Sequence, residues 1–293
     1  APVEPVLIDG GWENDGDGIL GADNKAAVAV AIELARRLTS SREPPAVSLE
    51  LLFTVCEEVG LRGADAFAVA GLSSRFGYAF DHATPIGEVV LASPTQYRIT
   101  ANVHGRSAHA GIRPEDGRSA IQAAAQGIAA MQLGRLDPET TANVGLISGG
   151  TAQNVVPERC QVVAEVRSLN QERAEAVTTE LVDHFQDGAD NAECDLDVEV
   201  DRSFAGYRTR SSEPPVVLAE SALRRCGYEP SHIVTGGGSD ANALQLAGFP
   251  CVNLANGTER NHQPDERVSV EALEGMLEVA IALVEEAPGV LSS

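Results

Sequence analysis

Basic residues are scarce in this chain of 293 residues, which carries 21 Lys and Arg against 43 Asp and Glu and has a formal net charge of -22. Lys25 is the only lysine. A strongly acidic surface repels the phosphates of nucleic acids and of anionic membranes, so we expect neither nucleic acid nor membrane as a partner. The charge gives no further information about chemistry.

Long apolar runs and paired cysteines are also absent from the sequence. No stretch reaches the roughly 18 residues of a membrane-spanning helix, and the first residues lack the basic start and apolar core of an export signal. The five cysteines form no CxxC pair, which argues against a disulfide framework and against a cysteine-ligated zinc site. We therefore expect reduced thiols and a cytoplasmic protein. Cys56 and Cys251 lie in apolar runs and are expected to be small core residues.

The length sets the expected number of domains. Single hydrophobic cores stop growing at roughly 250 residues, and this chain is longer, so one large domain plus a smaller one is expected. A hydrophobic share of 43% is typical of a globular protein.

Acidic residues and one histidine follow apolar runs at several points along the chain. They are Asp23 in LGADNKA, Glu57 and Glu58 in LLFTVCEEVG, Asp81 in YAFDHATP, and His262 in NGTERNHQPDE. In open α/β sheets, reactive groups gather beyond the carboxyl ends of the strands. Carboxylates and an imidazole at one such edge are the residue types of a zinc site with an adjacent general base. The pattern therefore predicts metal-assisted hydrolysis.

The periodicity predicts α/β elements around these residues. A helix is expected to begin at or just after Asp23, with apolar residues at Val28, Ile32 and Ala35. The run from Val47 to Cys56 predicts a strand buried on both faces of a parallel sheet, ending at Glu57 and Glu58. Further strands are predicted over 77–80, terminated by Asp81, and over 251–255, and a closing helix over 269–286 has Leu273, Leu277, Ile281 and Val284 on one face.

A different pattern occupies residues 93–205. It predicts a strand over 95–104, a helix over about 115–131, strands over 142–148 and 159–167, a helix over about 171–186 and a strand over 195–202. This βαββαβ order is that of a ferredoxin-like sandwich. We expect it to be a small domain inserted into the larger one, because α/β patterning resumes at Pro214.

Each candidate site residue also has an ordinary structural explanation when it is taken alone. Asp23 suits a helix N-cap, and a glutamate pair such as Glu57 and Glu58 is usually a solvated acidic turn. A single histidine in a polar loop, such as His262, is more often incidental. The remaining histidines outside the motifs, which are His82, His104, His184 and His232, keep that interpretation.

Seven sequence blocks, taken together and in order, carry a resemblance to a known family. They are LGADNKAAVA, FTVCEEVGLRGA, FDHATPIGEV, GRSAHAGIRPEDGRSAI, GGTAQNVVPERC, GGGSDANAL and GTERNHQPDE, from about residue 19 to residue 270. With these blocks the chain resembles the dizinc aminoacylase, carboxypeptidase and tripeptidase family of metallopeptidases, most closely peptidase T-like members. The resemblance implies an α/β fold in which a zinc-exopeptidase-like, doubly wound sheet domain (residues 1–92 and 206–293) carries an inserted ferredoxin-like α+β dimerisation or lid domain (residues 93–205).

The resemblance also implies roles for the residues that match the motifs. Asp23 would bridge two zinc ions, Glu58 and His262 would be zinc ligands of one site, and Asp81 would complete the other site. Glu57 would be the general base that takes a proton from water. A carboxylate suits the bridging position because it can offer one oxygen to each metal of a pair about 3.5 to 4 Å apart.

Further implied roles fall in the inserted domain. His109, in SAHAG, matches a histidine that reaches the active site of a partner subunit and helps to stabilise the oxyanion. Asn154 and Arg167 match residues that bind substrate, and an arginine suits a carboxylate through its bidentate fork. Arg167 has a structural alternative, since it ends a predicted strand. Asp240 and Asn242, in GGGSDAN, are expected to shape the loop beneath the metals.

One family ligand has no counterpart in this sequence. The family has a further zinc-binding histidine in an HxD motif upstream of the bridging aspartate, whereas no histidine precedes His82 here. We therefore expect an N-terminally truncated chain in which one site keeps Asp23, Glu58 and His262 and the other keeps only Asp23 and Asp81. The expected content is about one tightly bound zinc per chain, with cobalt or manganese as alternative metals.

The function implied by the resemblance is a zinc-dependent exopeptidase that hydrolyses short peptides in the manner of a tripeptide aminopeptidase. It would act as a homodimer assembled through the inserted domain. Two alternatives stay open: a carboxypeptidase or N-acyl amino-acid amidohydrolase on the same scaffold, and a catalytically impaired fragment or non-catalytic module.

Overall fold

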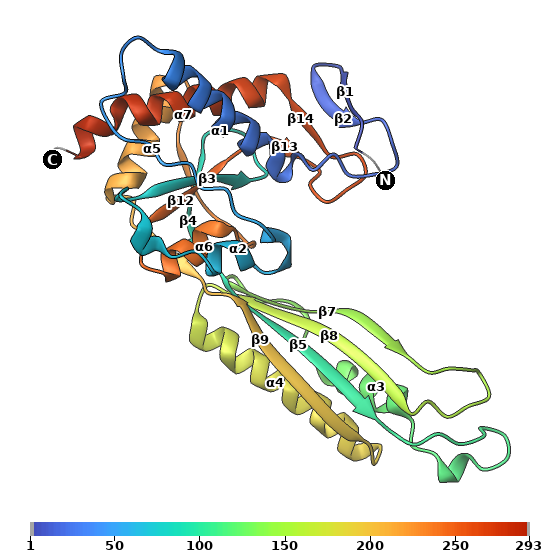
Figure 1. Cartoon of the computed structure of the whole chain (residues 1–293). Helices are drawn as coiled ribbons and strands as arrows, with labels where there is room; N and C mark the ends of the chain where they lie inside the picture. Colours follow the sequence, from blue (N-terminus) through green and yellow to red (C-terminus); the bar gives the residue numbers. More distant parts are fainter. Residues whose placement is uncertain (1–2, 292–293) are drawn as a thin grey trace. The chain divides into compact units, whose positions relative to one another are not determined.

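The computed structural model describes residues 3–291 of the chain (Figure 1). Residues Pro94–Gly206 form one compact unit, called unit 2 below, and the described residues on either side of it form the other, unit 1. Both units combine helices with β-sheet, so the fold is a mixed α/β fold. Among the described helices, none has both the length and the apolar character that crossing a lipid bilayer requires.

Unit 1 is built on a mixed five-stranded sheet. Its strands are β3 (Gly77–His82), β4 (Glu88–Ser93), β10 (Tyr207–Arg208), β11 (Ser231–Val234) and β12 (Cys251–Ala255), in the order β10-β4-β12-β3 with β11 also paired to β4. The pairs β12–β3 and β11–β4 are parallel, whereas β12–β4 and β10–β4 are antiparallel. The sheet is therefore mixed rather than purely parallel.

Helices cover both faces of this sheet. The helices α1 (Ala22–Ser40) and α7 (Val270–Leu291) come from opposite ends of the chain and lie side by side on one face, together with α5 (Pro214–Arg225) (Figure 1). The short helices α2 (Arg62–Asp65) and α6 (Asp240–Leu246) lie on the other face. Along β12, Val252 and Leu254 pack toward α5 and α7 while Cys251 packs with α6, as alternating strand side chains require.

A second, small sheet joins the two ends of unit 1. Its antiparallel order is β1-β2-β14-β13, formed by β1 (Pro5–Ile8), β2 (Gly11–Asn14), β14 (Arg267–Ser269) and β13 (Thr258–Glu259). The loop between β13 and β14 carries His262. The strand pairing of β13 with β14 therefore fixes both ends of that loop.

The predicted strand from Val47 to Cys56 is wrong. The segment forms no strand, and several of its apolar side chains are exposed, including Phe53 at 53% and Val55 at 70%. An apolar, β-branched run becomes a strand only where a neighbouring strand completes its hydrogen bonds, and no described strand pairs with this segment. Cys56 is exposed as well, so its predicted core role is also wrong, whereas Cys251 is buried as predicted.

Two further expectations about unit 1 need correction. β3 does not end at Asp81 but continues to His82. The apolar positions that predicted the first helix do not face the core, because Val28 and Ile32 are exposed. The core-facing residues are Ala22, Ala26, Val30 and Leu34. The closing helix is confirmed and is longer than predicted, with Leu277 and Val284 buried on the predicted face.

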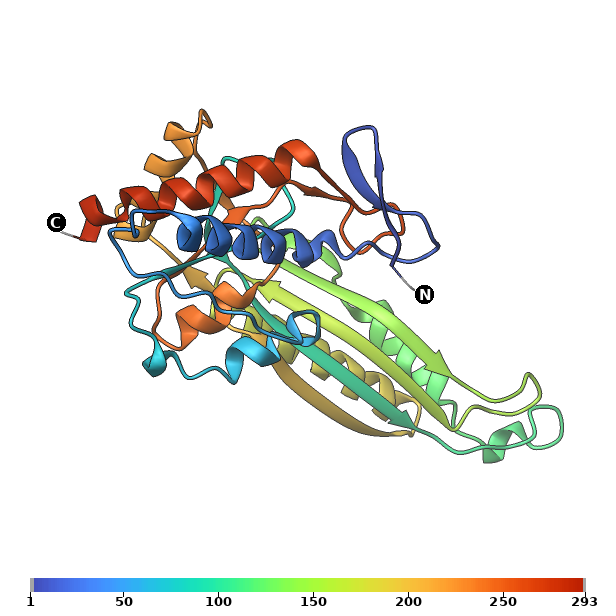
Figure 2. The same cartoon turned by 45° about the horizontal axis from the view of Figure 1, so that its top comes forward.

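Unit 2 has the predicted βαββαβ order. Its elements are β5 (Thr95–His104), α3 (Ala120–Ala130), β7 (Thr140–Gly149), β8 (Arg159–Ser168), α4 (Gln171–Asn191) and β9 (Asp195–Phe204), with an additional strand β6 (Gly134–Asp137). The antiparallel order β6-β7-β8-β5-β9 is that of a ferredoxin-like sandwich extended by one strand. Both helices cover the same face of the sheet (Figure 2), and Phe185 of α4 is fully buried beneath it.

Candidate metal centre

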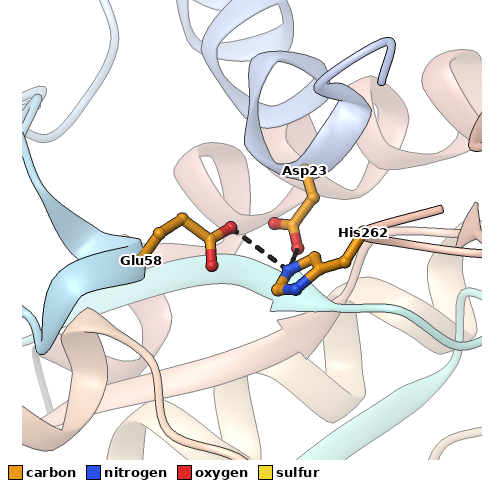
Figure 3. Close-up of side chains that lie close together, drawn as sticks. All are labelled: Asp23, Glu58 and His262. Atoms are coloured by element: carbon orange, nitrogen blue, oxygen red, sulfur yellow. Dashed lines mark hydrogen bonds and ion pairs between the residues drawn. The ribbon is translucent and has the colours of Figure 1, made fainter. Parts of the chain in front are cut away.

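Three side chains from separate parts of unit 1 converge on one point. Asp23, Glu58 and His262 each bring one ligand atom to within 4.8 Å of the others (Figure 3). The Nε2 atom of His262 lies 3.3 Å from Oδ2 of Asp23 and 3.2 Å from Oε1 of Glu58. Two carboxylate oxygens and one imidazole nitrogen are a donor set that zinc accepts in catalytic sites, which leave a fourth position open.

The turn before α1 positions Asp23. Gly21 adopts a left-handed conformation with φ 70°, which a residue without a Cβ atom takes up most readily. Asp23 and Asn24 have non-helical dihedral angles, and the peptide bond between them is cis. Asn261, next to His262, donates a hydrogen bond from Nδ2 to Oδ2 of Asp23 at 2.9 Å. The aspartate is thus held from the His262 loop as well as by its own turn.

Glu57 and Glu58 lie on a tight turn rather than at the end of a strand, which corrects the prediction. The turn is a single 3₁₀ segment, Glu57–Val59, flanked by the left-handed residues Cys56 and Gly60. It still separates the two carboxylates, because Glu57 is half-buried while Glu58 is exposed and reaches His262. The turn, rather than the alternation of side chains along a strand, directs the carboxylates of Glu57 and Glu58 to different surroundings.

The surroundings of Glu57 are crowded with negative charge. Burial, together with the charges of Glu58, Asp240 and Asp23, raises the pKa of Glu57 to about 7, although the charge of His262 acts in the opposite direction. A carboxylate with a pKa near neutrality can accept a proton from water at the pH at which enzymes work.

Asp81 lies beside the cluster without belonging to the three ligand atoms that converge. Its pKa is raised by burial first, then by the charges of Asp23 and Glu57 and by a hydrogen bond with Asp23. Asn24 donates a hydrogen bond from Nδ2 to Oδ1 of Asp81 at 2.7 Å. The carboxylates of Asp23 and Asp81 are therefore neighbours, which is the arrangement that a shared cation would require.

The protonation of His262 is set by two opposing effects. Burial lowers the pKa of its imidazole, and the charges of Glu58 and Asp23 more than offset this, so that the pKa is raised overall. A metal ligand must present a neutral nitrogen. Binding of a cation at this point would therefore release a proton from the His262 imidazole, whose protonated form Glu58 and Asp23 stabilise.

The predicted residues of the inserted domain lie in unit 2. His109 forms an isolated β-bridge with Val155, and the N–H of Ala110 donates to the carbonyl of Asn154 at 3.0 Å, so the segments that carry His109 and Asn154 run next to each other. Arg167 lies on β8 and forms an ion pair with Glu165 at 3.1 Å. The roles of these three residues in substrate binding and catalysis stay predictions.

The fold also shows polar residues around the site that the sequence reasoning had not singled out or had described only in general terms. Thr54 donates a hydrogen bond to the carboxylate of Asp240. Ser239 and Asn242 form the capping box of α6, which explains part of the GGGSDAN loop. Asn253 accepts a hydrogen bond from the N–H of Asp81 at 2.9 Å and donates one to the carbonyl of Asp81 at 3.3 Å. Only the capping box has a sequence signal, a serine followed three residues later by an amide.

Comparison with known proteins agrees with this architecture. Residues 94–193 match the peptidase dimerisation domain family, and residues 6–92 match the M42 glutamyl aminopeptidase family. The protein YqjE of Bacillus subtilis is 38% identical to this chain over 286 residues, which cover 97% of this chain and 76% of that protein.

Two solved structures are similar to the whole described chain. The aminopeptidase PepT from Bacillus cereus is 40% identical with a TM-score of 0.85, and the match covers 98% of this chain and 76% of that one. A tripeptidase from Staphylococcus aureus is 34% identical with a TM-score of 0.90, and the match covers 97% of this chain and 76% of that one. Sequence identity and fold agree over nearly the full length, and the chain belongs to the peptidase T-like family of metallopeptidases.

Proposed function

We propose that this protein is a zinc-dependent exopeptidase that hydrolyses short peptides in the manner of a tripeptide aminopeptidase. The observation that carries the proposal is the convergence of Asp23, Glu58 and His262 within 4.8 Å, with the half-buried Glu57 adjacent in the chain to one of them. The similarity to an aminopeptidase PepT and to a tripeptidase supports the same class of substrate.

The residues present fit a divalent cation. Asp23, Glu58 and His262 would hold it through two oxygens and one nitrogen, and the excess of negative charge around Glu57 and Asp81 favours a cation electrostatically. A zinc ion bound there supplies a Lewis acid that polarises the carbonyl of the substrate and makes water more acidic. Asp81, next to Asp23, would contribute to a second and weaker cation position.

The protein's own residues would carry out the proton transfer and bind the substrate. Glu57 takes a proton from the attacking water and returns it to the leaving amine. His109 of a partner subunit steadies the oxyanion, and Asn154 and Arg167 orient the substrate. To bind a substrate carboxylate, Arg167 would give up part of its ion pair with Glu165 and form hydrogen bonds to the substrate instead.

We also propose a homodimer assembled through unit 2, because the match to the peptidase dimerisation domain covers most of that unit. The five cysteines all carry free thiols, which favours a reducing compartment such as the cytoplasm. Light scattering after size-exclusion chromatography tests the dimer, and a monomer at micromolar concentration would contradict it.

Two measurements test the proposed function. Calorimetric titration with zinc should give about one tight ion per chain, since one cluster with three converging ligands is found among residues 3–291, and two equally tight ions would contradict the unequal sites. A panel of tripeptides, C-terminally blocked peptides and N-acylated amino acids then identifies the activity. Hydrolysis of the tripeptides from the amino end supports the proposal, whereas exclusive hydrolysis of the N-acylated compounds would assign an amidohydrolase instead.

A further inference from the structure

A buried carboxylate connects the two ends of the chain at the candidate metal centre. Glu266 lies at the end of the loop between β13 and β14, and only 1% of it is exposed. Its carboxylate accepts hydrogen bonds from the backbone N–H groups of Gly21, of Ala22 at 2.9 Å and of Asp23 at 3.3 Å. Its partners lie 243 to 245 residues away in the sequence.

Backbone N–H groups, rather than a basic side chain, compensate this buried charge. Glu266 forms no ion pair within the part of the chain that the structure describes. A buried carboxylate is costly unless several donors are directed at it, and donors at the start of a helix also benefit from the helix dipole. The arrangement therefore holds the Gly21–Asp23 turn firmly against the loop that carries Glu266.

A simple helix cap does not account for this geometry. Caps are normally supplied by a short polar side chain next to the first turn, and the N-cap residue of α1 is Gly21, which has no side chain to offer. The acceptor comes instead from the loop that carries His262, four residues before Glu266. In the same loop Asn261 donates to the side chain of Asp23. Glu266 thus binds the backbone of the segment that carries Asp23, while it belongs to the loop that carries His262.

The loop itself is compact, so fixing the position of Glu266 also restricts the position of His262. The N–H of Gln263 donates to the carbonyl of Arg260 at 3.1 Å, and the N–H of Glu266 donates to the carbonyl of Gln263 at 3.0 Å. Arg260 and His262 both adopt left-handed φ angles, of 56° and 65°. Two successive turns therefore connect His262 to Glu266 with little freedom between them.

We propose that Glu266 is a positioning residue of the metal centre, which fixes the separation of Asp23 and His262 without touching the cation. The inference rests on the proposed function, because it is the cation that needs this separation. Groups that orient metal ligands in this way typically contribute 10–100-fold to metal affinity.

The test is the substitution Glu266→Gln, which keeps the shape of the side chain, removes its charge and turns one acceptor into a donor facing N–H groups. Zinc affinity, measured by competition with a chromophoric chelator, should fall by about 10–100-fold. Hydrogen exchange of the metal-free chain should accelerate in both segments, 20–24 and 258–266. Glu266→Asp keeps the charge with a shorter reach and should fall between Glu266→Gln and the wild type in both measurements, which keeps the test available if Glu266→Gln does not fold.

A matched control is available in the same unit. Glu220 of α5 has a side chain that is 17% exposed, and its carboxylate is bonded to Arg224 and His232 and not to the site. Glu220→Gln therefore makes the same chemical change elsewhere and should leave zinc affinity within about two-fold. Wild-type zinc affinity in a folded Glu266→Gln or Glu266→Asp protein would overturn the positioning role.

Hydrogen exchange separates this inference from the proposed function. If the wild-type chain binds no zinc, the metalloenzyme proposal fails while the role of Glu266 is still decided by exchange. Faster exchange confined to residues 20–24 would show a helix cap only and would overturn the positioning of His262. Faster exchange in both segments would support the connection between them.

Discussion

Glu57 lies in an environment that is unusual for a carboxylate. It is half-buried, it has Glu58 as its sequence neighbour, and Asp240 and Asp23 add further negative charge around it. Its burial, followed by these neighbouring charges, raises its pKa to about 7. A group that is half protonated near neutral pH can both accept and return a proton, which is the requirement for a base that later serves as an acid.

Replacing this carboxylate tests its role at the residue scale. Glu57→Gln should lower kcat for tripeptide hydrolysis by about 10²–10⁴-fold, because the amide cannot take a proton. Zinc content by elemental analysis should be unchanged, since the three converging ligand atoms come from other residues. Glu43→Gln, at an exposed position on the same unit, serves as the control. Undiminished turnover in Glu57→Gln would assign the base elsewhere.

The raised pKa of Glu57 also predicts how pH affects the stability of the metal-free chain. The folded-state pKa of about 7 exceeds the ordinary value of 4.5, so the folded state binds more protons than the unfolded state between these pH values. Stability should therefore fall as the pH rises from about 4.5 to about 7. Asp81, with a raised pKa, acts in the same direction. The raised pKa of His262 does so too, because the stability that it contributes is lost as the pH rises above the ordinary value of 6.5.

Urea denaturation at a series of pH values checks this sign. The free energy of unfolding of Glu57→Gln, relative to the wild type, should increase across that pH window by the order of 1–2 kcal/mol after allowance for solvent screening. Saturating zinc should reduce the loss of wild-type stability at the upper end of the window, because the cation compensates the carboxylates. A difference between the two proteins that is independent of pH would refute the raised pKa of Glu57.

At the scale of elements, a buried amide and hydroxyl network ties β12, β3, β4 and α6 together. Asn253 of β12 bonds both backbone groups of Asp81 and donates to Ser239. Asn242 of α6 bonds Ser239 and Ser93 in turn. All of these side chains apart from that of Asp81 are at most 3% exposed. The network therefore fixes the backbone that carries Asp81 through buried hydrogen bonds.

Removing the central amide should weaken unit 1 markedly. Asn253→Ala leaves both backbone groups of Asp81 and the hydroxyl of Ser239 with fewer partners, and the expected loss in the free energy of unfolding is about 2–3 kcal/mol. Thr39→Ala, at the exposed end of α1, should stay within about 0.5 kcal/mol. Chemical denaturation monitored by circular dichroism gives both values, and a loss below about 1 kcal/mol would mean that water enters the network.

The sequence predicted the elements of unit 2 better than those of unit 1, and the reason is physical. The strands and helices of unit 2 all come from one continuous stretch of chain that contains every partner strand, and their periodicity predicted them closely. The segment from Val47 to Cys56 has the composition of a strand, yet composition cannot supply the partner strand that makes it one. The same limit explains α1, whose core-facing side is set by α7 from the far end of the chain.

In the candidate site, too, some residues could be predicted from the sequence and others could not. Asp23, Glu58 and His262 could be proposed from the sequence because the motifs that contain them, taken together and in order, resemble those of a known family, and the fold brings the three side chains together. Glu266 and Asn253 could not, because neither a glutamate in the polar stretch before β14 nor a single asparagine within the apolar strand β12 has a pattern that identifies its distant partners. Their roles depend on contacts with residues more than 170 positions away.

At the scale of the whole molecule, each unit has its own core. Phe185 anchors the core of unit 2 beneath its sheet, and Leu218 of α5 belongs to a core of unit 1. Both side chains are about 1% exposed. A substitution that weakens one core should therefore destabilise first the unit that contains that core.

Phe185→Ala should cost about 3–5 kcal/mol in the stability of unit 2 through lost burial and a cavity. Hydrogen exchange should accelerate in α4 but not in α7, and zinc affinity of the folded protein should change by less than about two-fold. Leu218→Ala is the reciprocal variant and should accelerate exchange in α5 and α7 instead. Uniform acceleration throughout the chain by either variant would mean that the units unfold as one.

The net charge of -22 acts on the whole molecule through self-repulsion. Compact packing brings like charges closer than they are in the unfolded chain, so repulsion destabilises the folded state. Added salt shortens the screening length from about 30 Å at 0.01 M to about 10 Å at 0.1 M and 3 Å at 1 M. The melting temperature of the metal-free protein should therefore rise steeply below about 0.2 M salt and level off above it.

Comparing two salts separates screening from cation binding at the site. Sodium chloride and tetramethylammonium chloride have the same ionic strength at equal concentration, but the large organic cation cannot enter a cluster whose ligand atoms lie within 4.8 Å of one another. Equal rises in melting temperature would assign the effect to general screening. A larger rise in sodium chloride that disappears in Asp23→Asn would assign the excess to the metal centre, and a melting temperature that does not change in either salt would show that the repulsion is already relieved by the arrangement of the charges.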